Sequence, residues 1–575
     1  MKQHQANTSI QKRIILLLSI LGLIACIAVL FPQVRIMIIH LAEKVLRREI
    51  LGYEGWIATF LSFAMGGILI ILFFDYCTLT HSGKILVKKT KQEIMDCMSE
   101  IDFRSLWKPV LFMSAIYLLG FFAILRANYS FVDDLDRAVN GTRGWDNWSR
   151  YVSEFLSIFI HADTNLTDIS PLPQLLAVLF LSMSSVLLIY IVDNKKLTVV
   201  RLLASIPLGL SPFFLTAISF KFDAPYMALS ILVCIVPFLF ITRKRAFIFC
   251  SFVSLLIMCM TYQVSSGIFM LITIIICFQD WKSRKRTDKD ILSFLGVSAL
   301  VFCFALVFFK FCLVKSSELE ENYVSTAIHP LPQMLPGILN NLKGYITNIW
   351  ANLAVTWRIC ILLILTLFIT KSIHDTSRKK MISFLVSLLV IGLSFISSYG
   401  IYILLNKPYF HPRALYGFGV FLAISGVYVV SDYKKIAAIP VLALSWSFLT
   451  FASSFGNALA DQARYDEFRT VSILRDLSSL YPDRILGLHI ENSVDFVPSI
   501  ENISKHYPII KKLVPKRLHE SIYYWGQVYI TKHFNYYSNQ ADISEPPSHD
   551  WPVVIDSYYH TIKSDGNCCL IILKH

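Results

Sequence analysis

The chain has 575 residues, of which 55 % are hydrophobic and only 16 % are charged, and its mean hydropathy is +0.58. Soluble domains usually carry about 25 % charged residues, so this composition excludes disorder, a coiled coil, collagen and an ordinary cytosolic enzyme, and it indicates many membrane spans. The net charge of +14 would suggest a nucleic-acid partner in a soluble protein, but in a membrane protein it reflects Lys and Arg in cytoplasmic loops.

About 13 apolar stretches are long enough to be predicted as transmembrane helices, each of which needs roughly 20 residues. They are centred in 14–32, 56–76, 108–126, 173–192, 200–219, 226–242, 246–262, 264–280, 291–312, 356–371, 382–405, 414–431 and 436–453. The first follows Lys12 and Arg13 and resembles a signal peptide. It is too long for a typical apolar signal region and lacks a small-residue cleavage site, so we interpret it as a retained span.

Clusters of Lys and Arg fix the predicted orientation. They occur at 84–91, 195–196, 243–245, 282–286, 378–380 and 434–435. All of them lie on one side if the N-terminus is cytoplasmic and every predicted span is real, as the positive-inside rule requires. The basic segment 35–48 would lie outside, and its spaced apolar residues indicate a helix in the membrane interface.

An odd number of spans places the polar segment 454–575 outside. Strand-like runs at 553–559 and 568–573 flank Asp565, Gly566 and Asn567, a pattern that predicts a β-hairpin in a small α/β domain. We therefore predict three parts: 1–107 with extra N-terminal spans, an interfacial helix and a basic cytoplasmic loop; 108–453 as the main transmembrane domain; and 454–575 as the outer C-terminal domain. The 12 cysteines show no zinc spacing, and we expect no disulfide framework and no metal site built from them.

The first large outer loop, about 127–171, contains closely spaced carboxylates at Asp133, Asp134 and Asp136, followed by Arg137. Such carboxylates repel one another, so one of them is expected to bind its proton more tightly and to suit the role of a general base. An isolated Asp pair beside a span is more often merely solvated. Asp134-x-Asp136 is also typical of nucleotide-sugar enzymes, but the outer location and the lack of a βαβ pattern argue against that interpretation. No metal is required, although a divalent ion at Asp133 and Asp136 stays open.

An amphipathic helix follows in the same loop, after Trp145 and Arg150. Its apolar stripe recurs at helical spacing on Trp148, Tyr151, Val152, Phe155, Leu156 and Phe159. This pattern is typical of a helix that lies on the membrane surface. Trp145 is either a platform for a sugar ring or a member of the interfacial aromatic belt.

Further outer turns present ionisable and polar side chains at span ends. Lys221 and Asp223 form either a structural pair or part of a site, because charges there are costly unless paired or used. Arg413 either extends to the interface or binds a lipid phosphate through its guanidinium group. Tyr262 and Gln263 either hydrogen-bond a sugar or pack at the interface.

Taken together, these residues resemble the phage-type serotype-converting O-antigen glucosyltransferases, the type II Gtr proteins. A span followed by D-D-x-x-R, then G-W, then an Arg-led amphipathic helix carries the resemblance, at Asp133, Asp134, Arg137, Gly144, Trp145 and Arg150. Later segments match at Phe222, Asp223, Pro225, Pro412, Arg413 and Asn457. The resemblance covers about 108–575, and Ser149 stands where many relatives have Gly.

The resemblance implies an α-helical polytopic glycosyltransferase of GT-C type in the bacterial inner membrane, with a periplasmic active site and a periplasmic C-terminal domain. It implies transfer of a sugar, expected to be glucose, from a polyprenyl-phosphate carrier such as undecaprenyl phosphate onto the O-antigen saccharide of lipopolysaccharide, which changes the serotype. The implied base is Asp133 or Asp134, and no cofactor is expected. The implied donor-phosphate ligands are Arg137, Arg150, Lys221 and Arg413. The implied sugar and acceptor contacts are Trp145, Asp223, Tyr262 and Gln263.

Two other classes of membrane protein fit part of the pattern. An O-antigen polymerase or ligase acts on similar lipid-linked glycans, but such enzymes rely on Arg- and His-rich outer loops between late spans, whereas the acidic loop here is early. A transporter or flippase often shows inverted repeats and ionisable residues near the membrane midplane. The sequence has no evident repeat and its ionisable residues lie at span ends, so the transferase is favoured.

Overall fold

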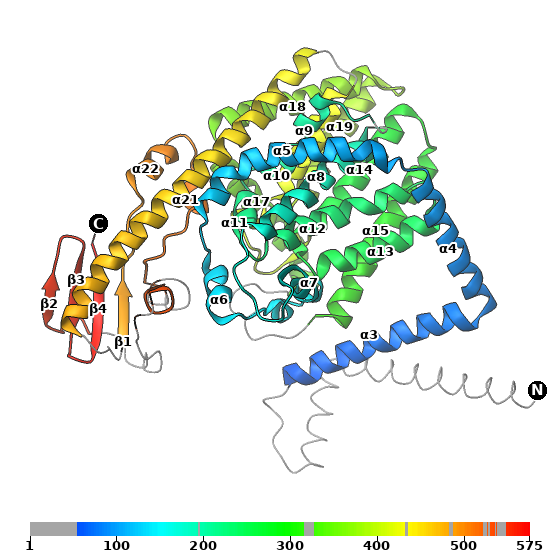
Figure 1. The fold of residues 1–575 in the computed structure, drawn as a ribbon. Helices are drawn as coiled ribbons and strands as arrows, with labels where there is room; N and C mark the ends of the chain where they lie inside the picture. Colours follow the sequence, from blue (N-terminus) through cyan, green and yellow to red (C-terminus); the bar gives the residue numbers. More distant parts are fainter. Residues whose placement is uncertain are drawn as a thin grey trace, which may run out of the picture.

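The computed structural model describes residues 54–193, 196–314, 327–431, 435–481, 487–520, 526, 529–534, 536 and 548–574. The predicted first span and the predicted interfacial helix at 35–48 lie outside these ranges. The described chain begins with α3 (Glu54–Leu79) and α4 (His81–Ser99), which meet at a bend of 91°. The structure is mainly helical, with one small sheet near the C-terminus (Figure 1).

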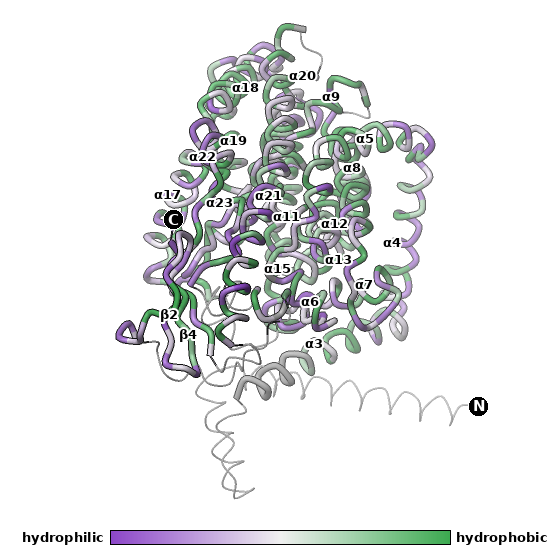
Figure 2. Tube along the Cα trace, turned by 60° about the vertical axis from the view of Figure 1, so that its left-hand side comes forward, coloured by the Kyte–Doolittle hydropathy of each residue, from purple (hydrophilic) through white to green (hydrophobic). Residues whose placement is uncertain are grey.

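Within the described residues, seven helices are long and apolar enough to cross a membrane, or eight if α3 and α4 form one broken span. The seven are α5 (Phe103–Ala127), α8 (Leu172–Val192), α14 (Ser266–Ser283), α15 (Asp288–Cys312), α18 (Val355–His374), α19 (Lys380–Ser397) and α21 (Ala438–Leu480). Figure 2 shows hydrophobic residues along much of this bundle, for example in α5 and α8. The protein is therefore a helical membrane protein.

Several stretches predicted as spans form shorter or interrupted helices. They are α9 (Val199–Ala204), α10 (Pro207–Leu210), α11 (Leu215–Ser219), α12 (Ala224–Ile235), η3 (Val236–Phe240), α13 (Lys244–Cys259) and α20 (Gly417–Val430). Proline explains three of the breaks, because it lacks a backbone N–H and is favoured in the first turn of a helix. Pro207, Pro225 and Pro237 each stand at such a helix start.

The remaining helical elements connect these helices or lie in loops. They are α6 (Val132–Asn140), η2 (Trp145–Trp148), α7 (Tyr151–His161), η4 (Gln263–Ser265), η5 (Leu331–Gln333), α17 (Met334–Asn352), η6 (Gly400–Leu404), η7 (Pro412–Ala414) and η8 (Lys435–Ala437). The core forms where α5, α8, α12 and α21 pack together. Gly456 permits a close approach of α21 to α5, because a Cβ there would lie 2.4 Å from the backbone of Ala123 in α5.

The C-terminal part is built around the C-terminal end of α21, which is 43 residues long and continues past the predicted domain boundary at 454. A four-stranded sheet follows in the order β1-β4-β3-β2, with β1 parallel to β4 and the other pairs antiparallel. Its strands are β1 (Gly487–Glu491), β2 (Val553–Asp556), β3 (His560–Ser564) and β4 (Cys568–Leu573). The short helical elements of this part are α22 (Pro498–Ser504), α23 (Ile510–Leu513) and η9 (Tyr529–His533).

The predicted small sheet is confirmed, but the predicted hairpin needs one correction. The turn 565–567 joins β4 to β3, not to one long strand over 553–559. That run is split because a turn interrupts it at Ser557, whose hydroxyl accepts the N–H of His560 (3.1 Å). Val553–Asp556 is therefore a separate edge strand paired with β3.

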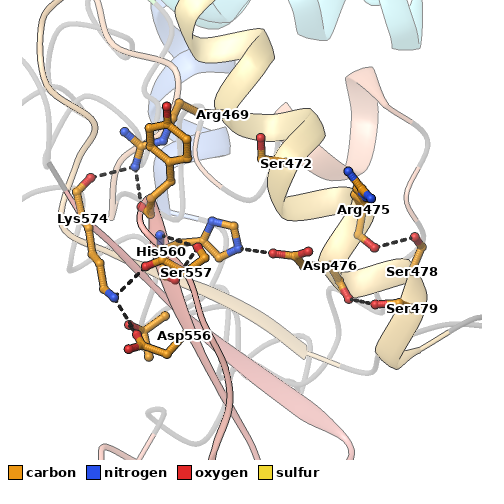
Figure 3. Close-up of polar contacts among 12 residues, drawn as sticks. Arg469, Ser472, Arg475, Asp476, Ser478, Ser479, Asp556, Ser557, His560 and Lys574 are labelled. Atoms are coloured by element: carbon orange, nitrogen blue, oxygen red, sulfur yellow. Dashed lines mark hydrogen bonds and ion pairs between the residues drawn. The ribbon is translucent and has the colours of Figure 1, made fainter.

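Side chains of α21 fix the sheet against the helix (Figure 3). The buried Arg469 donates through Nη2 to the carbonyl oxygens of Tyr559 (2.6 Å) and Lys574 (2.7 Å). Nε2 of the buried His560 lies 2.9 Å from Oδ2 of Asp476. A buried guanidinium group needs such acceptors, and these contacts hold the sheet on the C-terminal end of α21.

Candidate active site

The predicted acidic loop forms α6 directly after α5. Asn128, in the left-handed conformation (φ 46°), ends α5, and Phe131 is the N-cap of α6. Asp133 and Asp134 lie in the first turn of α6, where the unpaired N–H groups and the helix dipole favour negative charge. Gly141, with φ of +66°, ends the helix in a conformation that favours glycine.

The two adjacent carboxylates of α6 have opposite surroundings. Asp134 is fully buried. Its Oδ2 accepts the N–H of Phe131 (2.9 Å), and its Oδ1 accepts the N–H groups of Lys221 (3.0 Å) and Phe222 (3.3 Å). Burial raises the pKa of Asp134 to about 7 against the effect of these donors. Asp133, one position earlier in the helix, is exposed. Asp134 therefore links α6 to residues 221–222, whereas Asp133 is open to solvent.

A second buried cluster joins α6 to the start of α12. Arg137 forms an ion pair with Oδ2 of Asp223, and the indole Nε1–H of Trp145 donates to Oδ1 of the same carboxylate (2.6 Å). The Arg137 guanidinium group lies 4.3 Å from the centre of the Trp145 ring, and the Tyr226 ring packs edge-on at 5.2 Å. Trp145 is only 1 % exposed. In this conformation a sugar cannot reach the Trp145 ring. The contacts among Trp145, Asp223 and Arg137 hold the loop against the start of α12.

Lys221 is paired with a residue that the sequence patterns did not single out. Its Nζ lies 2.7 Å from Oδ2 of Asp168, and its side chain is 4 % exposed. The Lys221–Asp223 pair considered from the sequence does not form, because Asp223 is taken by Arg137. Asp168 lies in the same connection between α5 and α8 as α6. Its carboxylate is the one signal in the sequence that could have indicated it.

A third cluster holds arginine side chains on aromatic rings. The Arg150 guanidinium group lies 4.8 Å from the centre of the Tyr262 ring, which stacks on Tyr416 at 6.1 Å. Both Arg150 and Gln263, the latter at the start of η4, are half-buried. Among the described residues, the buried Nε of Arg150 has no hydrogen-bond partner. A buried N–H donor of this kind favours an anionic ligand.

Arg413 also lies on aromatic rings. Its guanidinium group is 5.2 Å from the centre of the Phe220 ring and 5.6 Å from that of Tyr409. Phe220 in turn packs on Phe131, the N-cap of α6, with ring centres 4.7 Å apart. The arginine cluster therefore adjoins the base of the acidic helix.

Other ionisable groups lie in the same segments of the chain as these clusters. Burial and the charge of Arg413 lower the pKa of His411 to about 3, so this imidazole is neutral. Asp136 accepts a hydrogen bond from Asn140 (2.7 Å). In the part of the chain that the structure describes, no group of three or more His, Cys, Asp or Glu side chains has the arrangement of a metal site.

The predicted amphipathic helix corresponds to α7, which begins directly after Arg150. Phe155 and Phe159 are 60 % and 66 % exposed, whereas Ser153 and Ser157 on the opposite face are buried. Large exposed apolar side chains on one face are typical of a helix lying in the membrane interface.

These features define a polytopic helical membrane protein whose ionisable residues gather beyond the ends of its helices. Residues 122–457 match the profile of the family described as glucosyl transferase GtrII, and the chain belongs to this family. This match extends from α5, through all three clusters, to α21. Family membership confirms the resemblance and indicates a glucosyltransferase.

A further match is to a phage protein. The chain is 29 % identical over 116 residues to an "uncharacterized 55.3 kDa protein in gtrB 5'region" of Salmonella phage P22. That similarity covers 20 % of this chain and 24 % of the phage protein's length. No solved structure matches the chain.

Proposed function

We propose that the protein is an inner-membrane glucosyltransferase of GT-C type that works at the periplasmic face, with about 13 spans and a cytoplasmic N-terminus. It transfers glucose from a polyprenyl-phosphate carrier onto the O-antigen saccharide. The observation that carries this proposal is the exposed carboxylate of Asp133, on a helix fixed by the buried Asp134 and beside an arginine cluster.

The proposed reaction is a single displacement. An acceptor hydroxyl attacks the anomeric carbon of glucose, the bond from that carbon to the phosphate oxygen breaks, and the polyprenyl phosphate leaves. The hydroxyl proton passes to Asp133, which acts as the general base. One displacement inverts the configuration at the anomeric carbon.

The leaving phosphate gains negative charge as the bond breaks and needs cations already in place. Arg150 and Arg413 supply them in this proposal, because both are half-buried and lie on aromatic rings that orient the guanidinium groups. Arg137 and Lys221 act at a distance, because Asp223 and Asp168 already pair with them. The exposed side of α7 lies in the interface, where the lipid tail of the donor enters.

The test is transfer of labelled glucose from polyprenyl-phosphate glucose to O-antigen in proteoliposomes. Asp133→Asn is expected to lower kcat by roughly 10²- to 10⁴-fold, as removal of a general base does. Asp136→Asn is the matched control, since it removes a carboxylate from the same helix. Full activity of Asp133→Asn contradicts the base assignment, and equal losses in both variants favour a divalent ion held by the two carboxylates.

Arg150→Ala tests the phosphate role in the same assay. We expect the KM for the lipid-linked donor to rise more than the KM for the acceptor, because the lost interaction is with the donor phosphate. Equal rises in both KM values contradict this role.

A further inference from the structure

The outer C-terminal domain contacts the link between α5 and α6. The hydroxyl of Tyr129, in this link, donates to the carbonyl oxygen of Pro515 (3.3 Å). The guanidinium group of Arg517 lies 4.1 Å from the centre of the Tyr129 ring, and its Nη2 approaches the carbonyl oxygen of Ser130 (3.5 Å). Pro515 and Arg517 thus lie against Tyr129 and Ser130, shortly before the first turn of α6.

Contacts with α21 and η9 hold Arg517 in place. Its backbone N–H donates to Oδ2 of Asp466 (2.9 Å), and its Nη1 donates to the hydroxyl of Tyr529 (3.1 Å). Asp466 is fully buried in α21 and also accepts a hydrogen bond from Gln462 (2.8 Å). The position of the Arg517 side chain is therefore set by α21 and η9, not by the loop that it contacts.

Because Arg517 is buried, its guanidinium group depends on the partners around it. Arg517 is 8 % exposed, and a guanidinium group removed from water needs counter-charges, acceptors or aromatic faces around it. The Tyr129 ring provides such a face on the side of α6, and a desolvated cation–π contact is stronger than an exposed one. Moving Tyr129 away would leave one face of the cation without its partner.

The start of α6 is therefore held between two anchors. One is the transmembrane bundle, through Asp134 and the packing of Phe131 on Phe220. The other is the C-terminal domain, through Arg517 and Tyr129. Asp133 follows this doubly held link by two residues in the chain.

We propose that Arg517 is a positioning residue for the transfer reaction, which fixes the start of α6 and thereby the carboxylate of Asp133. This inference rests on the proposed function. A displacement of about 1 Å at a reacting group can lower the rate on the order of 10²-fold. The C-terminal domain is then part of the catalytic unit, in addition to any contact with the acceptor.

Kinetics of Arg517→Ala in the full-length protein provide the first test. We expect kcat to fall on the order of 10- to 100-fold, with the KM values for donor and acceptor changed by less than about threefold. Arg517→Lys keeps the charge and should recover part of the loss. Arg464→Ala is the control, because it removes an exposed arginine of α21 that pairs only with Asp461 among the contacts described. A rise in the acceptor KM alone overturns the proposal and indicates direct acceptor binding.

A double-mutant cycle tests whether Arg517 acts through Tyr129. The losses in kcat for Arg517→Ala and Tyr129→Leu should be strongly non-additive, because each removes the same contact. The pair Arg517→Ala and Arg464→Ala should be additive. Additive losses for Arg517 and Tyr129 overturn the proposal.

Amide hydrogen exchange separates this proposal from the proposed function. In Arg517→Ala, exchange at residues 129–137 should become faster on the order of tenfold, while exchange in β1 to β4 stays unchanged. Asp133→Asn should leave both regions unchanged. If Asp133→Asn is fully active, the proposed function fails while the exchange result still stands. Unchanged exchange at 129–137, or faster exchange throughout the C-terminal domain, overturns the positioning role.

Discussion

Asp133 and Asp134 are neighbours in the sequence, yet the same substitution should affect them in opposite ways. Asp134 accepts three backbone N–H groups with its two oxygens. An asparagine has one oxygen, so whichever way its amide is turned, at least one buried N–H of Phe131, Lys221 or Phe222 loses its acceptor. An unpaired buried donor costs about 1–3 kcal/mol, so Asp134→Asn should lower the free energy of unfolding by about that amount.

Asp133→Asn should change the unfolding free energy by less than about 0.5 kcal/mol, because the side chain is exposed. The assay is titration of the purified protein in mixed micelles with a denaturing detergent, followed by tryptophan fluorescence, for both variants and the wild type. We expect Asp134→Asn to be both less stable and less active, and Asp133→Asn to be inactive but as stable as the wild type. Wild-type stability of Asp134→Asn would refute the role of its hydrogen bonds in holding α6.

Two further substitutions test the charges around the site. Asp223→Asn leaves the buried Arg137 without its counter-charge and should lower the unfolding free energy by about 3–5 kcal/mol in the same titration, whereas a loss below about 1 kcal/mol would contradict the pairing. Burial lowers the pKa of His411 to about 3, whereas an unfolded histidine takes up a proton near pH 6.5. His411 therefore contributes stability above pH 6.5, and this stability is lost as the pH falls toward 3. His411→Asn should lack this contribution, so the stability difference between wild type and variant should shrink on acidification; a difference independent of pH would contradict the neutral state of His411.

The sequence was sufficient to predict the family, the helical membrane fold and the small sheet near the C-terminus. Composition and apolar periodicity depend on local residue types, and these patterns indicate helices and strands directly. Helix lengths were less predictable, although Pro207, Pro225 and Pro237 marked three of the interruptions. The turn at Ser557 was missed because its signal is a single hydroxyl that accepts a backbone N–H.

The partners of the charged residues could not be predicted, because they come from distant parts of the chain. Lys221 and Asp223 are two residues apart, and a pair between them was one of two interpretations, yet they pair with Asp168 and Arg137 instead. Asp133 and Asp134 are equivalent in any sequence pattern. What separates them is which one faces residues 221–222, and that depends on how α6 docks against a loop almost 90 positions away.

Burial divides the charged groups around the candidate site into two kinds with different physical consequences. Asp134, Lys221 and Asp223 are buried, the Arg137 side chain is 11 % exposed, and all four have partners in place. A ligand that bound them would first have to break contacts that stabilise the fold. Asp133 is exposed, and Arg150 and Arg413 are half-buried on aromatic rings. In the proposed reaction, a substrate that covers these three groups removes water from them. The attraction of Arg150 and Arg413 for the donor phosphate then increases, because charges interact more strongly where water is excluded.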